Sequence, residues 1–162
     1  TGRNGSGKTT LIMCISNNFI GNTFNSNIRR KDTSLMEIGP SPSLMPELSL
    51  LENIKYFLFN DNINENIISN VLNKYELESF KSDLVRDFSS GMVKRSEIAI
   101  ADLKNPKVLC IDEPKVYLDE NGVDLLLNLI TKREKEGNAS ILSGQESIGA
   151  ITSIERSINL ND

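Results

Sequence analysis

Glycines, a lysine and a threonine follow one another at a fixed spacing near the start of the sequence. The run reads Gly2-Arg3-Asn4-Gly5-Ser6-Gly7-Lys8-Thr9, and it fits the phosphate-binding pattern G-x-x-x-x-G-K-[ST] at every fixed position. Glycines let the backbone turn so that consecutive amide N–H groups point at one anion. The alternative is a Gly/Ser-rich turn that matches by chance, and four specified positions argue against it. The residues expected to bind the phosphates are Asn4, Gly5, Ser6, Gly7, Lys8, Thr9 and Thr10.

Lys8 and Thr9 are the side chains of this run with specific chemistry. Lys8 supplies a mobile positive charge for the β- and γ-phosphates, and the Thr9 hydroxyl is placed to ligate Mg²⁺. The apolar character of residues 11–15 predicts a helix that opens at Lys8, and the N-terminal end of a helix also favours phosphate. The sequence therefore predicts a nucleoside triphosphate site in which Lys8 binds the phosphates and also neutralises the charge that develops on them during catalysis.

Two adjacent carboxylates follow a short apolar run later in the chain. Val108–Ile111 is continuously apolar, as expected of a parallel strand covered on both faces, and Asp112 and Glu113 come directly after it. Asp112 can then reach the coordination sphere of Mg²⁺, while Glu113 can face an attacking water. The alternative is a solvated strand end, which is less favoured once a phosphate-binding loop is present. Thr9 and Asp112 are thus the expected metal ligands, and Glu113 is the expected catalytic carboxylate.

These groups need a scaffold of alternating helices and buried strands, and the rest of the chain predicts one. Helices are expected at about 8–18, 49–58, 64–76, 89–105 and 121–136, and strands at 108–111 and 139–143. Two short candidate strands lie at 23–28 and 35–38 in an otherwise irregular stretch, and a weaker strand at 153–160. Ser49 and Glu52 have the spacing of a capping box, and residues 45–88 read as a small helical subdomain. The fold class is therefore α/β with a mainly parallel sheet, in one domain over residues 1–162. Only Thr1 precedes Gly2, so we expect that the strand that leads into such a loop is missing from this chain.

Composition excludes several classes of function. The 162 residues are 38% hydrophobic and 25% charged, which is ordinary for one globular domain, and the net charge of −4 gives no reason to expect nucleic-acid binding. No apolar segment approaches the length needed to cross a bilayer, so another chain would have to supply any membrane part. Cys14 and Cys110 lie in apolar runs and are expected to be reduced core residues. The absence of histidine excludes His-based catalysis and His metal ligands.

With these motifs in place, the chain resembles the ATP-binding domain of ABC transporters over nearly all of its length. Val108–Pro114 resembles the Walker B strand of that family with its catalytic glutamate, and Phe88–Met92 resembles the signature motif, usually LSGGQ. Pro46–Asn53 resembles the stretch that follows the Q-loop, and Tyr117–Asp119 sits where the D-loop belongs. The signature match is specific because of its position between the phosphate-binding loop and the Walker B strand.

The resemblance implies an ABC-type P-loop NTPase fold, with ATP and Mg²⁺ as cofactors. It implies that Ser89, Ser90 and Gly91 contact ATP held by a second ABC ATP-binding subunit, in a homodimer of head-to-tail copies, and that Asp119 belongs to the D-loop. It also implies separate transmembrane permease subunits. The chain would then lie peripherally on the cytoplasmic face of a bacterial inner membrane or the matrix face of the mitochondrial inner membrane. Within the family, the compact helical region and the residues Asp119, Asn121, Gly122 and Val123 look most like the ATP-binding subunit of the haem exporter used in cytochrome c maturation. Another small ABC ATPase is the alternative.

The sequence departs from the family pattern at two sensing positions. Pro40 stands where the Q-loop glutamine is expected, and Gln145, a further catalytic candidate, stands where the switch histidine is expected. Proline has no side-chain amide, and a glutamine amide hydrogen-bonds but does not titrate near neutral pH. Two hypotheses therefore stay open: an ATPase that couples hydrolysis to transport, and an ATP-binding regulatory or structural subunit with impaired hydrolysis. A third hypothesis is an ABC-type protein that acts on ribosomes or DNA. Such proteins usually have coiled coils or basic surfaces, and the sequence shows neither.

Overall fold

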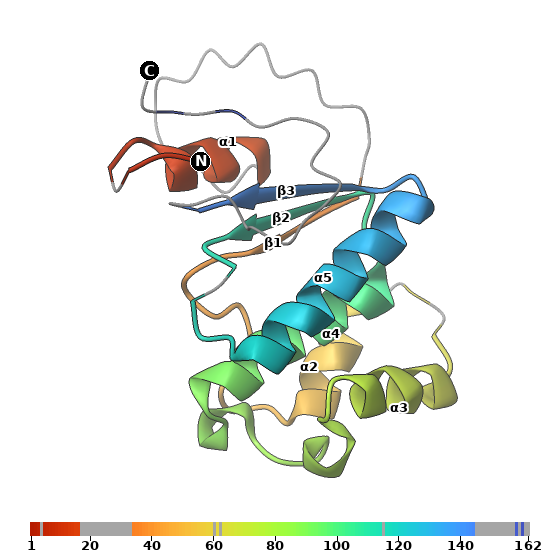
Figure 1. Ribbon diagram of the computed structural model, residues 1–162. Coiled ribbons are helices and arrows are strands. Elements are labelled where there is room, and N and C mark those ends of the chain that lie inside the picture. The colour runs from red at the N-terminus through yellow and green to blue at the C-terminus, as the bar shows by residue number, and fades with distance from the viewer. Residues whose placement is uncertain are drawn as a thin grey trace.

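A three-stranded parallel sheet forms the centre of the protein. The computed structural model describes residues 1–3, 5–16, 34–59, 61, 63–114, 116–144, 158 and 160. Within them the strands are β1 (Leu35–Ile38), β2 (Val108–Asp112) and β3 (Ala139–Ser143), in the order β1-β2-β3. β2 pairs in parallel with both neighbours, and all three arrowheads in Figure 1 point to the same edge. The predicted α/β class is confirmed, and the carboxyl ends of the strands meet at one edge.

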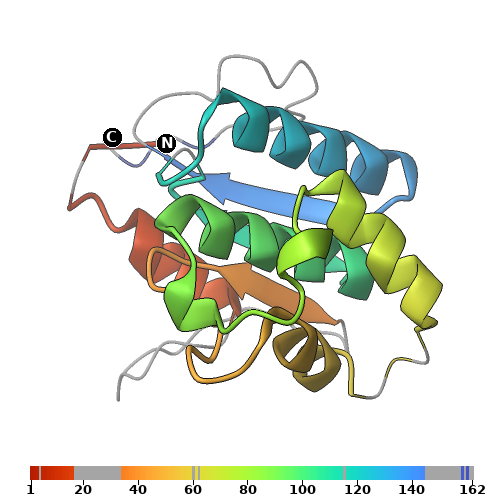
Figure 2. The same cartoon turned by 90° about the horizontal axis from the view of Figure 1, so that it is seen from below.

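Helices cover both faces of this sheet. α1 (Lys8–Ser16) packs on one face, while α4 (Ser90–Lys104) and α5 (Glu120–Lys135) lie on the other (Figures 1 and 2). β2 is the middle strand and is covered from both sides, which explains its unbroken apolar run. The burial of Leu109, Cys110 and Ile111 confirms that prediction.

Two further helices pack against α4 on the side away from the sheet. They are α2 (Leu50–Phe57) and α3 (Glu65–Lys74), followed by single 3₁₀ turns at Glu78–Phe80 and Val85–Asp87 (Figure 1). The predicted capping box begins α2: the Ser49 amide donates to Glu52 Oε2 at 2.8 Å, and the Glu52 amide donates to Ser49 Oγ at 3.3 Å. The separate helical subdomain over 45–88 stays a prediction. None of the described helices is both long and apolar enough to span a bilayer.

The sequence predicts that Ile67, Ile68, Val71 and Leu72 form the buried face of α3, and this prediction is partly wrong. Ile68 and Leu72 are buried as predicted, but Ile67 is 51% exposed and Val71 is only partly buried. On a helix of 3.6 residues per turn, positions 68 and 72 stack on one face, and the neighbouring position 67 turns away from it. The apolar stripe is therefore narrower than predicted.

The ends of the longer helices match their sequence signals. α4 stops at Asn105, which adopts a left-handed conformation with φ of 41°, just before Pro106. α5 is followed by Gly137 at φ of 73°. The strand predicted at 23–28 lies outside the described residues. Of the strand predicted at 153–160 only Ile158 and Leu160 are described, and the main chain of Thr1 hydrogen-bonds to both.

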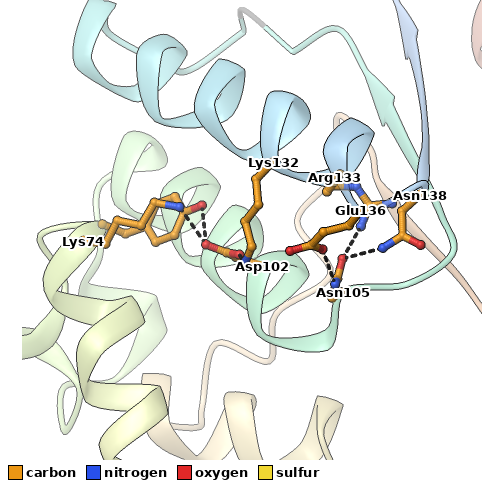
Figure 3. Close-up of polar contacts among 8 residues, drawn as sticks. Lys74, Asp102, Asn105, Lys132, Arg133, Glu136 and Asn138 are labelled. Atoms are coloured by element: carbon orange, nitrogen blue, oxygen red, sulfur yellow. Dashed lines mark hydrogen bonds and ion pairs between the residues drawn. The ribbon is translucent and has the colours of Figure 1, made fainter.

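A buried carboxylate ties three helices together (Figure 3). Asp102 of α4 accepts hydrogen bonds of 2.8 Å from Lys74 Nζ of α3 and from Lys132 Nζ of α5. Burial alone would raise the pKa of Asp102, but the two lysine hydrogen bonds outweigh it and leave that pKa below its ordinary value. The ionised carboxylate is therefore the form that the fold favours.

A second polar cluster joins α5 to the starts of β2 and β3. The Arg133 guanidinium is fully buried and donates to Asn105 Oδ1, to Ser140 Oγ and to the carbonyl oxygens of Pro106 and Ala139. Figure 3 shows Arg133 and Asn105 reaching toward each other from α5 and the end of α4. These contacts hold α5 against the segments where the two strands begin.

Both cysteines are buried and free, as predicted. Cys14 lies on α1 and Cys110 on β2. Burial raises the pKa of the Cys110 thiol to about 11, so it stays protonated near neutral pH.

Candidate functional site

The run at 2–9 wraps the N-terminal end of α1. Gly5 and Gly7 have φ of 83° and 92°, in the region that side-chain-bearing residues rarely adopt. A Cβ atom on Gly2 would lie 2.5 Å from Ser6 Oγ, and the Ser6 amide donates to the carbonyl oxygen of Arg3 at 3.2 Å. The glycines are thus required by the conformation itself, as the pattern predicts.

Lys8 is the first residue of α1 and points back into this loop. Its side chain is only 6% exposed, and Nζ donates to the carbonyl oxygens of Gly2 at 2.8 Å and Arg3 at 2.9 Å. Nζ also lies 4.0 Å from Glu113 Oε1. The loop therefore carries its positive charge at its centre, beside the acidic end of β2.

Asp112 at the end of β2 is held from two sides. The Thr9 hydroxyl donates to Asp112 Oδ2 at 2.6 Å, and the Ser143 hydroxyl donates to Oδ1. Asp112 is 3% exposed, so each carboxylate oxygen has a defined partner in a nearly dry position. The two expected metal ligands, Thr9 and Asp112, are thus in direct contact, although their role toward a metal stays a prediction.

Glu113 leaves the strand through an unusual backbone conformation. Its φ is 51°, a left-handed value that is uncommon for a residue with a side chain, and its amide donates to the carbonyl oxygen of Ser143 at 3.2 Å. Such conformations cluster at functional sites, where the surrounding structure enforces them. Here the turn brings the partly exposed Glu113 carboxylate to Lys8.

Ser143 was not predicted from the sequence. A signal for it exists, because Ser143 is a polar residue that ends an apolar strand, in the same way as Asp112 ends β2. In the parallel pairing of β2 with β3 these two residues stand opposite each other. Only the register between the strands, which the sequence does not give, shows that they meet.

The site fits the phosphates of a nucleotide together with Mg²⁺. Ser6 Oγ is a buried polar atom with no hydrogen-bond partner in the described part of the chain, and it lies in the loop next to Lys8. Thr9 and Asp112 supply the hard oxygen atoms that Mg²⁺ prefers. In the described ranges, no cluster of three or more His, Cys, Asp or Glu residues is arranged to hold a metal. Mg²⁺ is usually bound through one or two carboxylates, waters and substrate phosphates.

The signature and D-loop residues lie beside each other. Ser89 caps the N-terminus of α4, and a Cβ on Gly91 would lie 3.3 Å from the carbonyl oxygen of Tyr117. Asp119 caps α5, where its Oδ1 accepts a 2.8 Å hydrogen bond from the Gly122 amide. Both motifs therefore have a structural role as helix caps in addition to the functional role that the resemblance implies.

The signature residues do not reach the phosphate-binding loop of their own chain. Ser89, Ser90 and Gly91 begin α4, and Figure 1 shows this end of α4 far below the loop, with the carboxyl ends of the strands between them. Ser89 and Ser90 are exposed. This arrangement agrees with the implication that the signature serves a nucleotide on another subunit.

The remaining candidate residues are in part outside the described structure. Asn4 and Gln145 are not among the described residues, so their roles stay predictions. Thr10 is exposed on the first turn of α1, and Pro40 is exposed in the loop after β1.

A buried ion pair connects α4 to the loop after β1, and it too was not predicted. Lys94 Nζ donates to Glu97 Oε2 at 2.8 Å and to the carbonyl oxygen of Gly39 at 2.7 Å. Glu97 Oε1 accepts hydrogen bonds from the Ser43 amide at 2.7 Å and from its hydroxyl at 3.0 Å. The loop around Pro40 is therefore fastened at both ends to the helix that carries the signature.

The sequence matches that of known proteins in a consistent way. Residues 1–116 match the ABC transporter family. The chain is 28% identical to "Uncharacterized ABC transporter ATP-binding protein YybJ" of Bacillus subtilis, over 99% of this chain and 78% of that protein. It is 34% identical to "Lantibiotic transport ATP-binding protein SrtF" of Streptococcus pyogenes, over 88% of this chain and 65% of that protein. It is 29% identical to "Cytochrome c biogenesis ATP-binding export protein CcmA" of Shewanella oneidensis, over 93% and 74%.

Solved structures share the fold. An ATP-binding subunit of an ABC transporter superposes with a TM-score of 0.76 at 24% identity, over 93% of this chain and 68% of that one. A dimeric ATP-binding cassette in a post-hydrolysis state, bound to ADP and Pi, superposes with a TM-score of 0.72 at 22% identity, over 90% and 72%. The chain spans between 65% and 78% of the three relatives named above. By the family match and the shared fold, this chain belongs to the ABC transporter family as an ATP-binding protein.

Proposed function

We propose that this chain binds Mg-ATP in the loop at 2–9 and hydrolyses it as the energy-coupling subunit of an ABC transporter. The observation that carries the proposal is the meeting of Lys8, Asp112 and Glu113 at one edge of the sheet. Lys8 Nζ lies 4.0 Å from Glu113 Oε1, and Thr9 links the loop to Asp112 through a 2.6 Å hydrogen bond. A cation, a metal-binding carboxylate and a second carboxylate are the parts that phosphoryl transfer to water requires.

Each residue has a distinct task in this proposal. Lys8 and the loop amides bind the phosphates and stabilise the charge that develops on them. Thr9 and Asp112 would hold Mg²⁺, which would supply further neutralisation of the charge on the phosphates. Glu113 orients the attacking water and accepts hydrogen bonding from it, and its left-handed backbone aims its carboxylate toward Lys8.

The proposal includes a second ABC ATP-binding subunit and separate membrane-spanning permease subunits. The exposed start of α4, remote from the loop of its own chain, supports a site that a partner completes. The dimeric cassette among the similar structures supports the same assembly. The chain would lie peripherally on the membrane, on the cytoplasmic or the matrix side.

The finer part of the proposal is that the cargo is haem, exported during cytochrome c maturation. The similarity to CcmA supports it. Similarities of comparable strength extend to a lantibiotic transporter subunit, to the lipoprotein-releasing protein LolD and to the arabinose transport protein AraG. Stimulation of ATP turnover by haem, in membranes that contain the full-length protein and its own permease, tests this part separately. Stimulation by a lantibiotic or a lipoprotein instead of haem would contradict it.

A second candidate function is an ATP-binding subunit whose hydrolysis is impaired. The observation in its favour is Pro40, which lies exposed in the loop after β1 and offers no side-chain amide to a metal or phosphate. Gln145, at the position where the switch histidine is expected, also favours this second candidate. ATP would then hold a complex together without being consumed.

One experiment separates the two candidates. ATP binding and turnover are measured for the full-length protein with its membrane partners, for Glu113→Gln, and for Glu65→Gln as a control at an exposed carboxylate on α3. The ATPase proposal expects turnover by the wild-type protein and by Glu65→Gln, and loss of turnover with ATP binding retained in Glu113→Gln. Binding without turnover in the wild-type protein supports the second candidate. Turnover that survives Glu113→Gln shows that Glu113 is not the catalytic residue.

A further inference from the structure

We infer that Ser143 is a positioning residue for the two carboxylates at the end of β2, where its hydroxyl fixes Asp112 and its carbonyl oxygen fixes Glu113. This inference rests on the proposed function, because it concerns the metal that Asp112 would hold. It adds to the site a residue that lies outside the phosphate-binding loop and the acidic pair.

The contacts of Ser143 are the basis of the inference. Its hydroxyl donates to Asp112 Oδ1, and its carbonyl oxygen accepts a 3.2 Å hydrogen bond from the Glu113 amide. Ser143 and Asp112 are the last residues of β3 and β2 and stand opposite each other in the parallel register. One residue thus contacts both adjacent acidic residues, one through its side chain and one through its main chain.

The hydroxyl matters because the outer torsion of an aspartate is loosely defined by itself. The χ2 angle of Asp is broad and roughly two-fold, so hydrogen bonds decide which way the carboxylate plane faces. Asp112 Oδ2 is engaged by Thr9 at 2.6 Å, and Oδ1 by Ser143. With Asp112 only 3% exposed, water does not readily replace a lost partner. Removing the Ser143 hydroxyl therefore frees the carboxylate to rotate away from the Thr9 hydroxyl.

Because Ser143 contacts Glu113 through its main chain, the role of its hydroxyl toward Asp112 can be tested separately from its contact with Glu113. A side-chain substitution at Ser143 leaves its carbonyl oxygen, and with it the bond to the Glu113 amide, in place. A residue that only supports the strand would affect ATP affinity equally with and without Mg²⁺. A residue that positions Asp112 affects only the part of ATP affinity that depends on Mg²⁺.

The test compares ATP affinity in Mg²⁺ and in EDTA for the full-length protein by isothermal titration calorimetry. The variants are Ser143→Ala, Ser143→Val, which removes the hydroxyl but favours a strand, and Ser143→Thr, which restores the hydroxyl. Ser140→Ala is the matched control, because Ser140 lies on the same strand and contacts Arg133 Nε. The Mg²⁺ concentration that gives half-maximal turnover is measured alongside.

We expect Ser143→Ala and Ser143→Val to raise that Mg²⁺ concentration by about 10-fold or more, the usual effect of removing a partner of a metal ligand. The ATP affinity of these two variants in EDTA stays at the wild-type value. For Ser143→Thr, the Mg²⁺ concentration that gives half-maximal turnover returns most of the way to the wild-type value. Ser140→Ala matches wild type in both measurements. Unchanged Mg²⁺ dependence in Ser143→Ala and Ser143→Val, or an equal loss of affinity in EDTA, overturns the inference while the proposed function stands. A wild-type protein that binds no Mg-ATP overturns both.

Discussion

The Nζ atom of Lys8 lies 4.0 Å from Glu113 Oε1, although one residue opens α1 and the other follows β2. Lys8 Nζ also donates to the carbonyl oxygens of Gly2 and Arg3. An ammonium group has three donors, so this position suits a cation that serves the loop and the acidic edge together. The pairing makes Lys8 the electrostatic link between phosphate binding and the expected catalytic carboxylate.

Replacing Lys8 should therefore weaken ATP binding strongly. Hydrogen bonds to charged groups contribute about 1.5–3 kcal/mol, so Lys8→Ala is expected to lower ATP affinity by about 10- to 100-fold. The measurement is equilibrium binding of ATP in Mg²⁺, with Lys55→Ala as the control, because the Lys55 side chain is 58% exposed on α2. Equal ATP affinity for Lys8→Ala and Lys55→Ala would contradict the assignment of the loop.

Two serine helix caps allow the signature role to be separated from the structural role. Ser89 caps α4 and Ser49 caps α2, and each accepts a hydrogen bond from the amide three residues later. Loss of such a cap costs about 1 kcal/mol of stability, so Ser89→Ala and Ser49→Ala should lower the free energy of unfolding by similar amounts. Only Ser89→Ala should also reduce ATP turnover, since Ser89 is expected to contact the partner's nucleotide.

The comparison needs two measurements, urea unfolding of each variant and ATP turnover of the assembled protein. A Ser89→Ala protein that loses stability but keeps full turnover would leave Ser89 as a helix cap alone. A comparable loss of turnover in Ser49→Ala would mean that stability, and not a contact with nucleotide, limits activity.

Local signals in the sequence predicted much of the fold. The capping box at Ser49 and Glu52, the apolar run of β2 and Gly137 after α5 each depend on residues close in the chain, and each matches the structure. The phosphate-binding loop belongs to the same class, because its glycines adopt the required backbone by themselves. Predictions of this kind succeed when residues close in the chain determine the local conformation of a segment by themselves.

Contacts between distant segments were not predictable in the same way. Ser143 meets Asp112 only through the register of β2 and β3, and Lys94 meets the carbonyl of Gly39 only through the packing of α4 against the loop. On the sequence alone, Glu97 reads as an ordinary polar residue of a helix. Its complete burial depends on an ion pair that no periodicity reveals.

Removing only one partner of the buried pair of Lys94 and Glu97 should lower the free energy of unfolding strongly. Glu97 is 0% exposed, and Glu97→Ala would leave the buried Lys94 without its carboxylate partner. Breaking a buried pair by removing one partner typically costs about 3–5 kcal/mol, while replacing both partners by apolar residues often costs little. We therefore expect Glu97→Ala to be strongly destabilising and the double variant Lys94→Met with Glu97→Leu to recover most of the loss.

Urea unfolding of Lys94→Met, of Glu97→Leu and of the double variant that combines them measures this coupling as a double-mutant cycle. Additive losses would show that the pair is not coupled. The same proteins report on function, because the pair fastens the Gly39–Ser43 loop to α4. Recovered stability with reduced turnover in the double variant would show that the loop must be held by these polar contacts.

Asp102 predicts how stability depends on pH. Burial would raise its pKa, but hydrogen bonds from Lys132 and Lys74 hold it below the ordinary value, so the folded protein favours the ionised carboxylate. A group with a depressed folded pKa stabilises the fold above its unfolded pKa of about 3.9, and this contribution is lost as pH falls through the folded pKa. Asp102→Asn keeps the shape but removes the charge, and it should cost about 1–3 kcal/mol near pH 7.

The difference between wild type and Asp102→Asn should therefore shrink as pH falls below about 4, because the unfolded wild-type chain then binds a proton at Asp102 that the folded, ionised carboxylate does not. Urea unfolding from pH 7 down to pH 3 measures it, with Asp124→Asn as a control at an exposed position of α5. Surface substitutions usually change stability by less than about 0.5 kcal/mol, so the control should match wild type at pH 7. A difference for Asp102→Asn that stays constant across this range would mean that lost packing, and not the charge between Lys74 and Lys132, causes the destabilisation.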